Sequence, residues 1–191
     1  MAHTHLLVGT TGSGKTHTLQ RLAARAAADP TATTWAIEPA HHATLTTTAD
    51  RCADFDGAER LLDQLLDLAR ERAAACVATG STTHTPIGDQ PRVLLLIDEA
   101  DHLLRRPRVG EQLQDLVVTG RALAIETAVA ANHLRLDVWP LGLRDQLLAG
   151  DITVHGTPDR CTADLLRERI ADGTATVLPH ATRTLTAHFG D

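Results

Sequence analysis

The sequence predicts a three-layer α/β fold with a mainly parallel central sheet, and three observations lead to this prediction. Short apolar runs alternate along the chain with longer segments that have the spacing of amphipathic helices. The run Val93–Ile97 is apolar without alternation, which suits a central strand covered on both faces. A glycine-rich segment, Gly9–Thr16, joins the first apolar run to the first helical one. Strands that alternate with helices imply parallel pairing through right-handed crossovers.

The first half of the chain predicts two strands and two helices before the central apolar run. In order, we expect a strand at Leu6–Val8, a helix at Thr16–Ala28, a strand at Thr33–Glu38, an irregular polar segment at His41–Asp54, a helix at Gly57–Ala78 and a loop at Thr79–Pro91. The first helix should stop at Asp29-Pro30, because proline cannot continue it. The second carries leucines at helical spacing with charges between them, which predicts one buried face.

The second half repeats the alternation after the strand Val93–Ile97. We expect a helix at Gly110–Leu123, a strand at Ile125–Ala131, a short helix at Leu141–Leu148, a strand at Ile152–His155, a helix at Thr162–Ala171, and strands at Thr174–Leu178 and Thr184–Phe189. The last two strands could close the fold as a β-hairpin within residues 174–189. A chain of 191 residues is long enough for one core, so we expect a single domain over residues 1–191.

Composition and charge narrow the class of protein. The net charge of −6 argues against a protein that coats DNA passively, although a ring-shaped motor needs basic groups only along its channel. Three cysteines without C-x-x-C spacing suggest neither disulfides nor a thiol metal site, which fits a reducing cytoplasm. The glycine-rich segment begins at residue 9, leaving no room for a signal peptide, and no apolar run is long enough to span a bilayer.

The glycine-rich segment is a complete phosphate-binding loop. It matches G-x-x-x-x-G-K-S/T and lies after a predicted strand and before a predicted helix, as this motif requires. We expect its backbone amides to bind the phosphates of ATP, with the lysine on the β- and γ-phosphates and the final threonine hydroxyl on Mg²⁺. The loop residues are Gly9, Thr10, Thr11, Gly12, Ser13, Gly14, Lys15 and Thr16. Lys15 is the only lysine among 18 basic residues.

Two carboxylates follow the central apolar strand. Asp98 and Glu99 come directly after Val93–Ile97, at the sheet edge where ligands bind in this fold class. We expect Asp98 to hold Mg²⁺ and Glu99 to act as the general base on the attacking water. The alternative is that both are ordinary acidic residues at a helix start. A base next to the Mg²⁺ carboxylate favours hydrolysis of ATP over phosphoryl transfer to a small acceptor.

Asn132 ends the next predicted strand and has two interpretations of equal weight. Its amide could sense the γ-phosphate or orient water, or it could be a turn residue after a strand. No histidine has metal-ligand spacing or cysteine neighbours, so we expect no metal other than Mg²⁺. Trp35 and Trp139 are isolated in the sequence, and we expect them to pack in the core.

Taken together, these motifs resemble the FtsK/SpoIIIE/HerA branch of the RecA-like P-loop motor ATPases. The start His5–Thr16 resembles that family's opening, Val93–Asp101 its V-x-x-I-D-E-x-x-D segment, and Thr119–Ile125 its R-x-G-R-x-x-G-I stretch. Leu141–Gln146 is similar to a later I-R-x-N segment. The resemblance implies a three-layer RecA-like fold, Mg²⁺-dependent ATP hydrolysis, assembly as a ring and double-stranded DNA as a partner.

The chain departs from this family in several places. The family's A-T-Q-R-P appears as Ala130–Leu134, without its arginine and proline, and its D-P-K appears as Glu38-Pro39-Ala40, without its lysine. The membrane segment and the winged-helix module of full-length translocases do not occur in these 191 residues. The sequence therefore suggests a minimal motor, or one that depends on a membrane-bound or DNA-targeting partner.

The family resemblance also suggests functional roles for arginines. Arg121 matches the family's trans-acting arginine finger, which reaches the ATP of the neighbouring subunit, and Arg144 is a second candidate. A solvated helix-end arginine is the alternative for Arg121. The basic run Arg105, Arg106 and Arg108 could face DNA phosphates, but such a run is more often a solvated loop.

The leading hypothesis is a DNA-stimulated, ATP-driven DNA translocase or transfer motor that works as a hexameric ring in the cytoplasm. Two alternatives stay open: a P-loop ATPase whose nucleotide state switches assembly with a partner, and a viral-type DNA-packaging ATPase.

Overall fold

The computed structural model describes residues 4–179 and places seven strands in one sheet, in the order β3-β2-β4-β5-β1-β6-β7. Each neighbouring pair of these strands runs parallel. The strands are β1 (Thr4–Gly9), β2 (Ala32–Ile37), β3 (Arg51–Ala53), β4 (Arg92–Ile97), β5 (Ile125–Ala131), β6 (Asp151–His155) and β7 (Ala175–Leu178). The predicted parallel sheet is confirmed.

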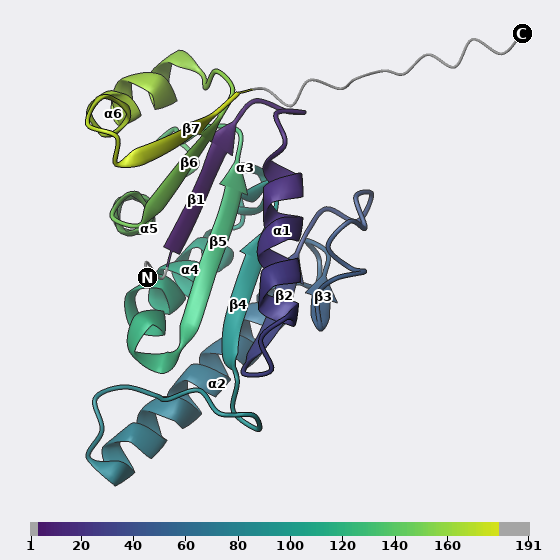
Figure 1. The fold of residues 1–191 in the computed structure, drawn as a ribbon, viewed down its shortest axis with the longest axis vertical. Coiled ribbons are helices and arrows are strands. Elements are labelled where there is room, and N and C mark those ends of the chain that lie inside the picture. The colour runs from purple at the N-terminus through teal and green to yellow at the C-terminus, as the bar shows by residue number, and fades with distance from the viewer. Residues whose placement is uncertain (1–3, 180–191) are drawn as a thin grey trace, which may run out of the picture.

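Helices cover both faces of this sheet and complete the three layers (Figure 1). They are α1 (Lys15–Ala27), α2 (Ala58–Thr79), α3 (Ala100–Leu103), α4 (Pro107–Gly120), the 3₁₀ turn η1 (Arg121–Leu123), α5 (Leu141–Leu148) and α6 (Arg160–Ala171). Helix α1 packs on one face of the sheet, while α2, α4, α5 and α6 pack on the other. This arrangement confirms the predicted three-layer α/β class.

The core divides between these two faces. On the α1 face, Leu19 and Ala23 pack against Leu94 and Leu96 of β4. On the opposite face lies the larger cluster, in which Leu62 of α2 and Leu113 of α4 share a core with Leu95. Strand β4 is therefore covered on both faces, which explains why its sequence does not alternate. Trp35 and Trp139 are buried in the larger cluster, as the sequence predicted.

Several predicted elements are corrected by the structure. The segment 41–54 is not wholly irregular, because residues 51–53 pair with β2 as the edge strand β3. A single turn of helix, α3, follows Glu99 and was not predicted. Helix α4 begins at Pro107 rather than Gly110, and α6 begins at Arg160, where Asp159 caps its N-terminus through the backbone N–H groups of residues 161 and 162.

The C-terminal strand joins the edge of the sheet. Residues 175–178 pair in parallel with β6. The expected partner strand, Thr184–Phe189, lies outside the described residues. None of the helices within residues 4–179 is long and apolar enough to span a membrane.

Candidate functional site

The glycine-rich loop lies at the carboxyl ends of the parallel strands, between the end of β1 and the start of α1. Gly12 and Gly14 have positive φ angles of 78° and 102°, a conformation that other residues rarely adopt. A Cβ atom at Gly9 would overlap the carbonyl oxygen of His155 on the adjacent strand β6. These glycines therefore allow the loop to turn tightly just before α1, and the N-terminus of a helix favours a bound anion.

Lys15 is held inside this loop by three hydrogen bonds. Its Nζ donates to the carbonyl oxygens of Gly9 at 2.6 Å and Thr10 at 3.0 Å, and to the side-chain oxygen of Asn132 at 3.0 Å. Burial lowers the pKa of Lys15 below its usual value, although the negative charges of Asp98, Asp101 and Glu99 oppose this shift. The ammonium is thus fixed at the junction of β1, α1 and β5.

Thr16 and Asp98 form the second contact across the site. The Thr16 hydroxyl donates to Oδ2 of Asp98 at 2.7 Å, and Asp98 is almost fully buried. The other carboxylate oxygen of Asp98 accepts the backbone N–H of Glu99 at 3.0 Å. Two oxygen donors from different elements therefore lie together, and oxygen is the ligand type that Mg²⁺ prefers.

Glu99 adopts an uncommon backbone conformation at the end of β4. Its φ and ψ angles are 50° and 44°, in the left-handed region, which costs about 1–2 kcal/mol for a residue with a side chain. Strained residues of this kind cluster at functional sites. The Glu99 carboxylate is about one-fifth exposed, and it lies 3.6 Å from Nε2 of His42 and 3.8 Å from Nδ1 of His102.

Asn132 has a defined orientation in the site. Asp101, on α3, accepts the backbone N–H of Asn132 at 2.9 Å and its side-chain NH₂ at 3.3 Å. The amide oxygen is thereby left to face Lys15 and the hydroxyl of Thr11. Asp101 is 1% exposed, so its charge lies inside the protein beside these donors. If Asn132 were only a turn residue after a strand, its side chain would not need to be held in one orientation.

Asp101 was not assigned a role from the sequence, although a signal was present. It follows Asp98 by three residues, and the single turn of α3 places it over the end of β5, where Asn132 lies. Glu38 was also missed. Its buried carboxylate accepts the backbone N–H groups of Thr44, Leu45 and Thr46, and so fixes the turn that follows β2.

Hydrogen bonding also sets the charge of Glu38. Burial opposes ionisation of this carboxyl, but the hydrogen bonds from residues 44–46 outweigh burial and lower its pKa. The carboxylate is therefore charged at neutral pH and serves as an anchor for the loop. It stands where the resembled family has an aspartate, and it accepts hydrogen bonds from residues 44–46 and, at 3.9 Å, from the Cys52 thiol on β3.

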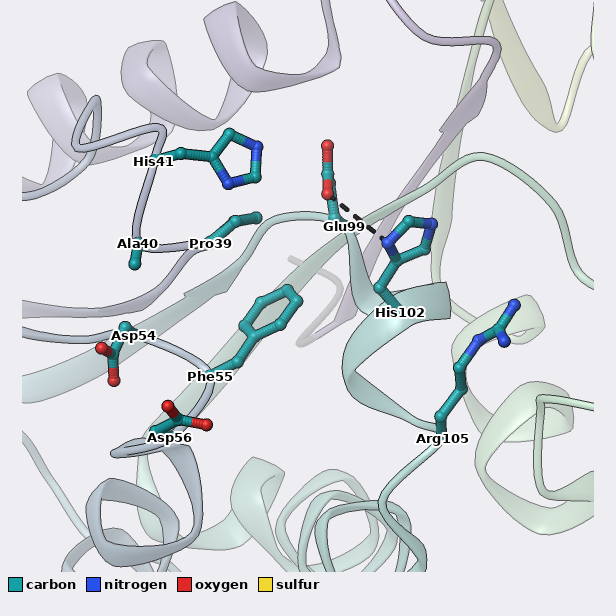
Figure 2. Close-up of a pocket in the computed structure, with 9 residues that line it drawn as sticks. All are labelled: Pro39, Ala40, His41, Asp54, Phe55, Asp56, Glu99, His102 and Arg105. Carbon is teal, nitrogen blue, oxygen red and sulfur yellow. Dashed lines mark ion pairs between the residues drawn. The ribbon is translucent and has the colours of Figure 1, made fainter.

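A cavity of about 540 Å³ opens beside Glu99 (Figure 2). Glu99 and His102 line it from the β4–α3 side, His41 from the turn after β2, and Phe55 and Arg105 from its far walls. The Glu99 side chain is thus accessible from this space. The cavity adjoins the proposed base and does not surround the loop itself.

The two candidate arginine fingers, Arg121 and Arg144, lie apart from the site residues described above. Arg121 is exposed at the start of η1, directly before β5, and therefore at the opposite edge of the sheet from the phosphate-binding loop. Arg144 on α5 has a side chain only 14% exposed, and its NH2 lies 3.7 Å from Asp145. Of the two, Arg121 is the one whose side chain is free to reach another molecule.

The basic run is divided by the structure. Arg106 forms an ion pair with Asp56 at 2.6 Å, and Arg108 forms one with Asp63 at 2.7 Å. Both contacts link the start of α4 to α2 or to the segment before it. Arg105 instead lines the cavity. Two of the three charges are therefore already paired within the chain.

Comparison with known proteins gives a family and a fold. A family model described as an AAA domain matches residues 3–132. No curated protein matches the sequence. The cytoplasmic domain of EssC superposes with a TM-score of 0.70 and 17% identity, over 86% of this chain and 35% of that one.

Two further structures extend the comparison. The pCW3 conjugation coupling protein TcpA, as a monomer with ATPγS, has a TM-score of 0.62 and 17% identity over 76% of this chain and 47% of that one. The genome packaging NTPase B204 of Sulfolobus turreted icosahedral virus 2, with AMPPCP, has a TM-score of 0.53 and 14% identity over 90% and 84%. The matched region spans less than half of EssC and of TcpA. These likenesses confirm the predicted fold of RecA-like P-loop motor ATPases.

Proposed function

The chain belongs to the AAA domain family, whose model covers more than half of it, and we propose that residues 1–191 form a single ATPase domain. This domain is proposed to drive the movement of double-stranded DNA. We propose further that it works as a hexameric ring in the cytoplasm. The observation that carries the ATPase part is the convergence of five residues at one edge of the sheet, from the start of α1 (Lys15, Thr16), the end of β4 (Asp98, Glu99) and the end of β5 (Asn132).

Each of these residues has a chemical role in the proposal. The backbone amides of Gly9–Thr16 bind phosphate oxygens, and Lys15 exchanges its bonds to the loop carbonyls for bonds to the β- and γ-phosphates. The Thr16 hydroxyl and the Asp98 carboxylate would hold Mg²⁺, because both are oxygen donors and lie 2.7 Å apart. When bound, the ion neutralises charge that develops on the phosphates.

Glu99 is proposed to accept a proton from the attacking water. It is the partly exposed carboxylate of the site and faces an open cavity, whereas Asp98 and Asp101 are buried and already hydrogen-bonded. Asn132 is proposed to orient that water or to contact the γ-phosphate, since Asp101 holds its amide with the oxygen toward Lys15. General base catalysis of this kind contributes about 10²–10⁴-fold to rate.

Replacing Lys15 with alanine should weaken ATP binding by about 10- to 100-fold, because hydrogen bonds to a charged group contribute about 1.5–3 kcal/mol each. No second lysine in the chain can take over the contact. Calorimetric titration with a non-hydrolysable ATP analogue measures the change. Arg21→Ala, which removes an exposed cation from the same helix, is the matched control and should bind as the wild type does. Unchanged affinity in Lys15→Ala would refute the assignment.

The DNA part of the proposal rests on likeness of fold to motors whose names specify DNA-related work. TcpA is a conjugation coupling protein and B204 a genome packaging NTPase. The position of Arg121, at the edge of the sheet opposite the phosphate-binding loop, supports the proposed assembly as a ring. Val77, Ile87 and Val118 are exposed apolar side chains on α2, the following loop and α4, and the two helices both end at the edge where Arg121 lies. Exposed apolar side chains at this end of the molecule suit contact with a neighbouring subunit.

Duplex DNA should raise the steady-state ATPase rate several-fold if the chain is a motor, because DNA bound in the ring would bring neighbouring subunits into the contacts that hydrolysis requires. The measurement is phosphate release with and without linear duplex DNA, at low and at physiological salt, since contacts to phosphates weaken as salt rises. A DNA-independent rate at both salt concentrations would exclude the motor in this form. A longer chain or a DNA-targeting or membrane-bound partner would supply the remaining parts of the machine.

One observation favours the second candidate, a nucleotide-dependent assembly switch. The net charge is −6, and Arg106 and Arg108 are paired with acidic groups of the chain itself, which weakens the one dense basic run as a contact for DNA phosphates. A switch should change its self-association between ATP and ADP and hydrolyse ATP at the same rate with or without DNA. A viral-type packaging ATPase would instead behave as the motor does in the DNA experiment.

A further inference from the structure

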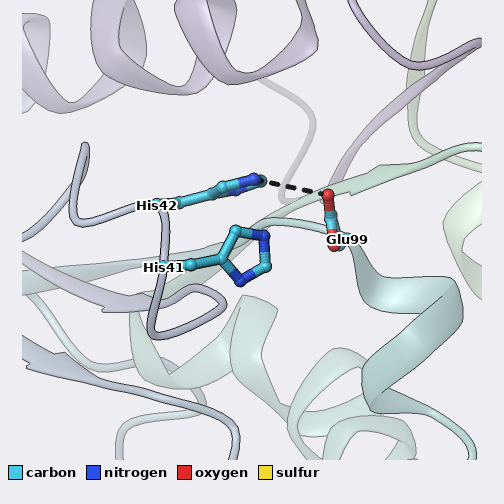
Figure 3. A group of neighbouring side chains, drawn as sticks. All are labelled: His41, His42 and Glu99. Atoms are coloured by element: carbon cyan, nitrogen blue, oxygen red, sulfur yellow. Dashed lines mark ion pairs between the residues drawn. The ribbon is translucent and has the colours of Figure 1, made fainter.

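The turn after β2 brings two histidines to the proposed catalytic carboxylate (Figure 3). The rings of His41 and His42 stand edge to face with centroids 4.3 Å apart, and Nε2 of His42 lies 3.6 Å from Oε1 of Glu99. One ligand atom from each of His41, His42 and Glu99 lies within 4.8 Å of the others. This grouping was not predictable from the sequence, because His42 and Glu99 are more than fifty residues apart along the chain.

The turn that carries these histidines is fixed by its own contacts. The backbone N–H of His42 donates to Pro39 at 2.9 Å, and Ala43 has a positive φ of 43°. Glu38 then binds the backbone N–H groups of residues 44–46. The backbone therefore holds both rings on the side of the turn that faces Glu99, and Figure 3 shows the rings and the carboxylate converging.

We propose that His41, His42 and Glu99 form a binding site for a divalent transition metal of the Zn²⁺ type. It would lie beside the Mg²⁺ site of Thr16 and Asp98, since Nδ1 of His42 is 3.8 Å from Oδ2 of Asp98. Imidazole nitrogens and a carboxylate suit zinc, whereas Mg²⁺ prefers oxygen donors. Three protein ligands leave one position of a tetrahedral ion open, as in sites that exchange ligands. His41 is exposed, so an ion can reach the site from solvent.

The geometry requires only a small closure. Zinc bonds of about 2.0–2.1 Å place tetrahedral ligand atoms about 3.3 Å apart. The His42–Glu99 distance is already 3.6 Å, so the remaining closure falls mainly to the exposed ring of His41. His102 is on the other side of Glu99 and contacts its second oxygen, Oε2, at 3.8 Å (Figure 2). It can therefore remain outside the site.

Occupation of this site would slow hydrolysis, and this consequence rests on the proposed function of Glu99. A divalent cation bound to one carboxylate oxygen lowers the basicity of the whole group, because a nearby positive charge favours its ionised form, so Glu99 accepts a proton from water less readily. The phosphate-binding loop contributes no ligand to the site, so ATP binding should persist. The metal would act as an inhibitor that excess Mg²⁺ does not displace.

Direct binding is measured first, without nucleotide, by titrating Zn²⁺ into the full chain against a chromophoric chelator. The wild type should bind one equivalent. His41→Ala should weaken binding at least about tenfold, since even outer-shell changes lower metal affinity by about 10- to 100-fold. His102→Ala and His84→Ala remove a histidine beside Glu99 and one at a distance, and both should leave the affinity unchanged. Equal affinity in His41→Ala and the wild type would overturn the proposal, as would an equal loss in His102→Ala.

Two further measurements, of the unfolding temperature and of the ATPase rate, test the zinc site independently of the titration. Zn²⁺ should raise the unfolding temperature of the wild type and not that of His41→Gln, which retains a polar side chain if the alanine variant folds poorly. The ATPase rate with saturating Mg²⁺ should fall on adding Zn²⁺ for the wild type but not for His41→Ala. Zinc that binds as expected without slowing hydrolysis supports the site and refutes Glu99 as the base. Absence of zinc binding overturns the site and leaves the proposed ATPase untouched.

Discussion

Arg121→Ala should lower the ATPase rate by about 10³-fold or more while ATP affinity stays near the wild-type value. Strand β5 separates Arg121 from Asn132, and its seven residues span about 23 Å at about 3.3 Å each. No side chain crosses that distance, so Arg121 can act only on the nucleotide of a neighbouring subunit. A finger in trans stabilises charge on the γ-phosphate in the transition state, and its loss therefore affects turnover rather than binding. Steady-state kinetics and a separate binding titration distinguish the two.

Mixing two inactive variants tests the shared site more directly. Lys15→Ala subunits retain Arg121, and Arg121→Ala subunits retain an intact phosphate-binding loop. Co-assembled mixtures should recover part of the ATPase activity that each protein lacks alone. Arg60→Ala, an exposed arginine at the other end of α2, is the matched control and should keep its activity. If demonstrated mixed assemblies stay as inactive as the separate variants, the shared-site model is wrong and the switch becomes the better explanation.

Glu99→Gln should reduce hydrolysis by at least about 100-fold and leave ATP binding intact, because the amide keeps the shape of the side chain but cannot accept a proton. Single-turnover measurement of phosphate release reports the chemical step without the contribution of product release. The backbone at residue 99 is already in the left-handed region, and the substitution leaves that strain unchanged.

The control for this variant is Glu111→Gln, which neutralises an exposed carboxylate on α4, a helix that packs on the face of the sheet opposite α1. It should hydrolyse ATP at the wild-type rate. A wild-type rate in Glu99→Gln itself would identify Glu99 as a helix-start residue and leave the base unassigned.

The fold was predictable where local sequence carries the information. The apolar run of β4 and the glycine-rich loop each indicate a local structure, and the alternation of strands with helices predicts the parallel sheet. Strand β3 was not predictable, because it is three residues long and is held by long-range contacts such as that of Asp50 with Thr34. The pairing of β7 with β6 is likewise set by tertiary contacts and not by local sequence, since a short strand can join a sheet in either direction.

The site was predictable in part for the same reason. Lys15, Thr16 and Asp98 belong to motifs whose spacing reflects their chemistry, and the structure places their side chains together. The approach of His41 and His42 to Glu99 depends on the direction of a turn, which Glu38 sets through bonds to backbone atoms several residues away. Adjacent histidines in a polar segment give no indication of that direction.

The lone lysine has a practical consequence for covalent labelling. Among these 191 residues, Lys15 carries the only ε-amino group, and burial lowers its pKa, so more of it is the neutral, nucleophilic amine at a given pH. Its small exposed fraction admits only compact acylating reagents. One such modification would mark the phosphate-binding loop of each chain, and its protection by nucleotide would report occupancy subunit by subunit within an assembly.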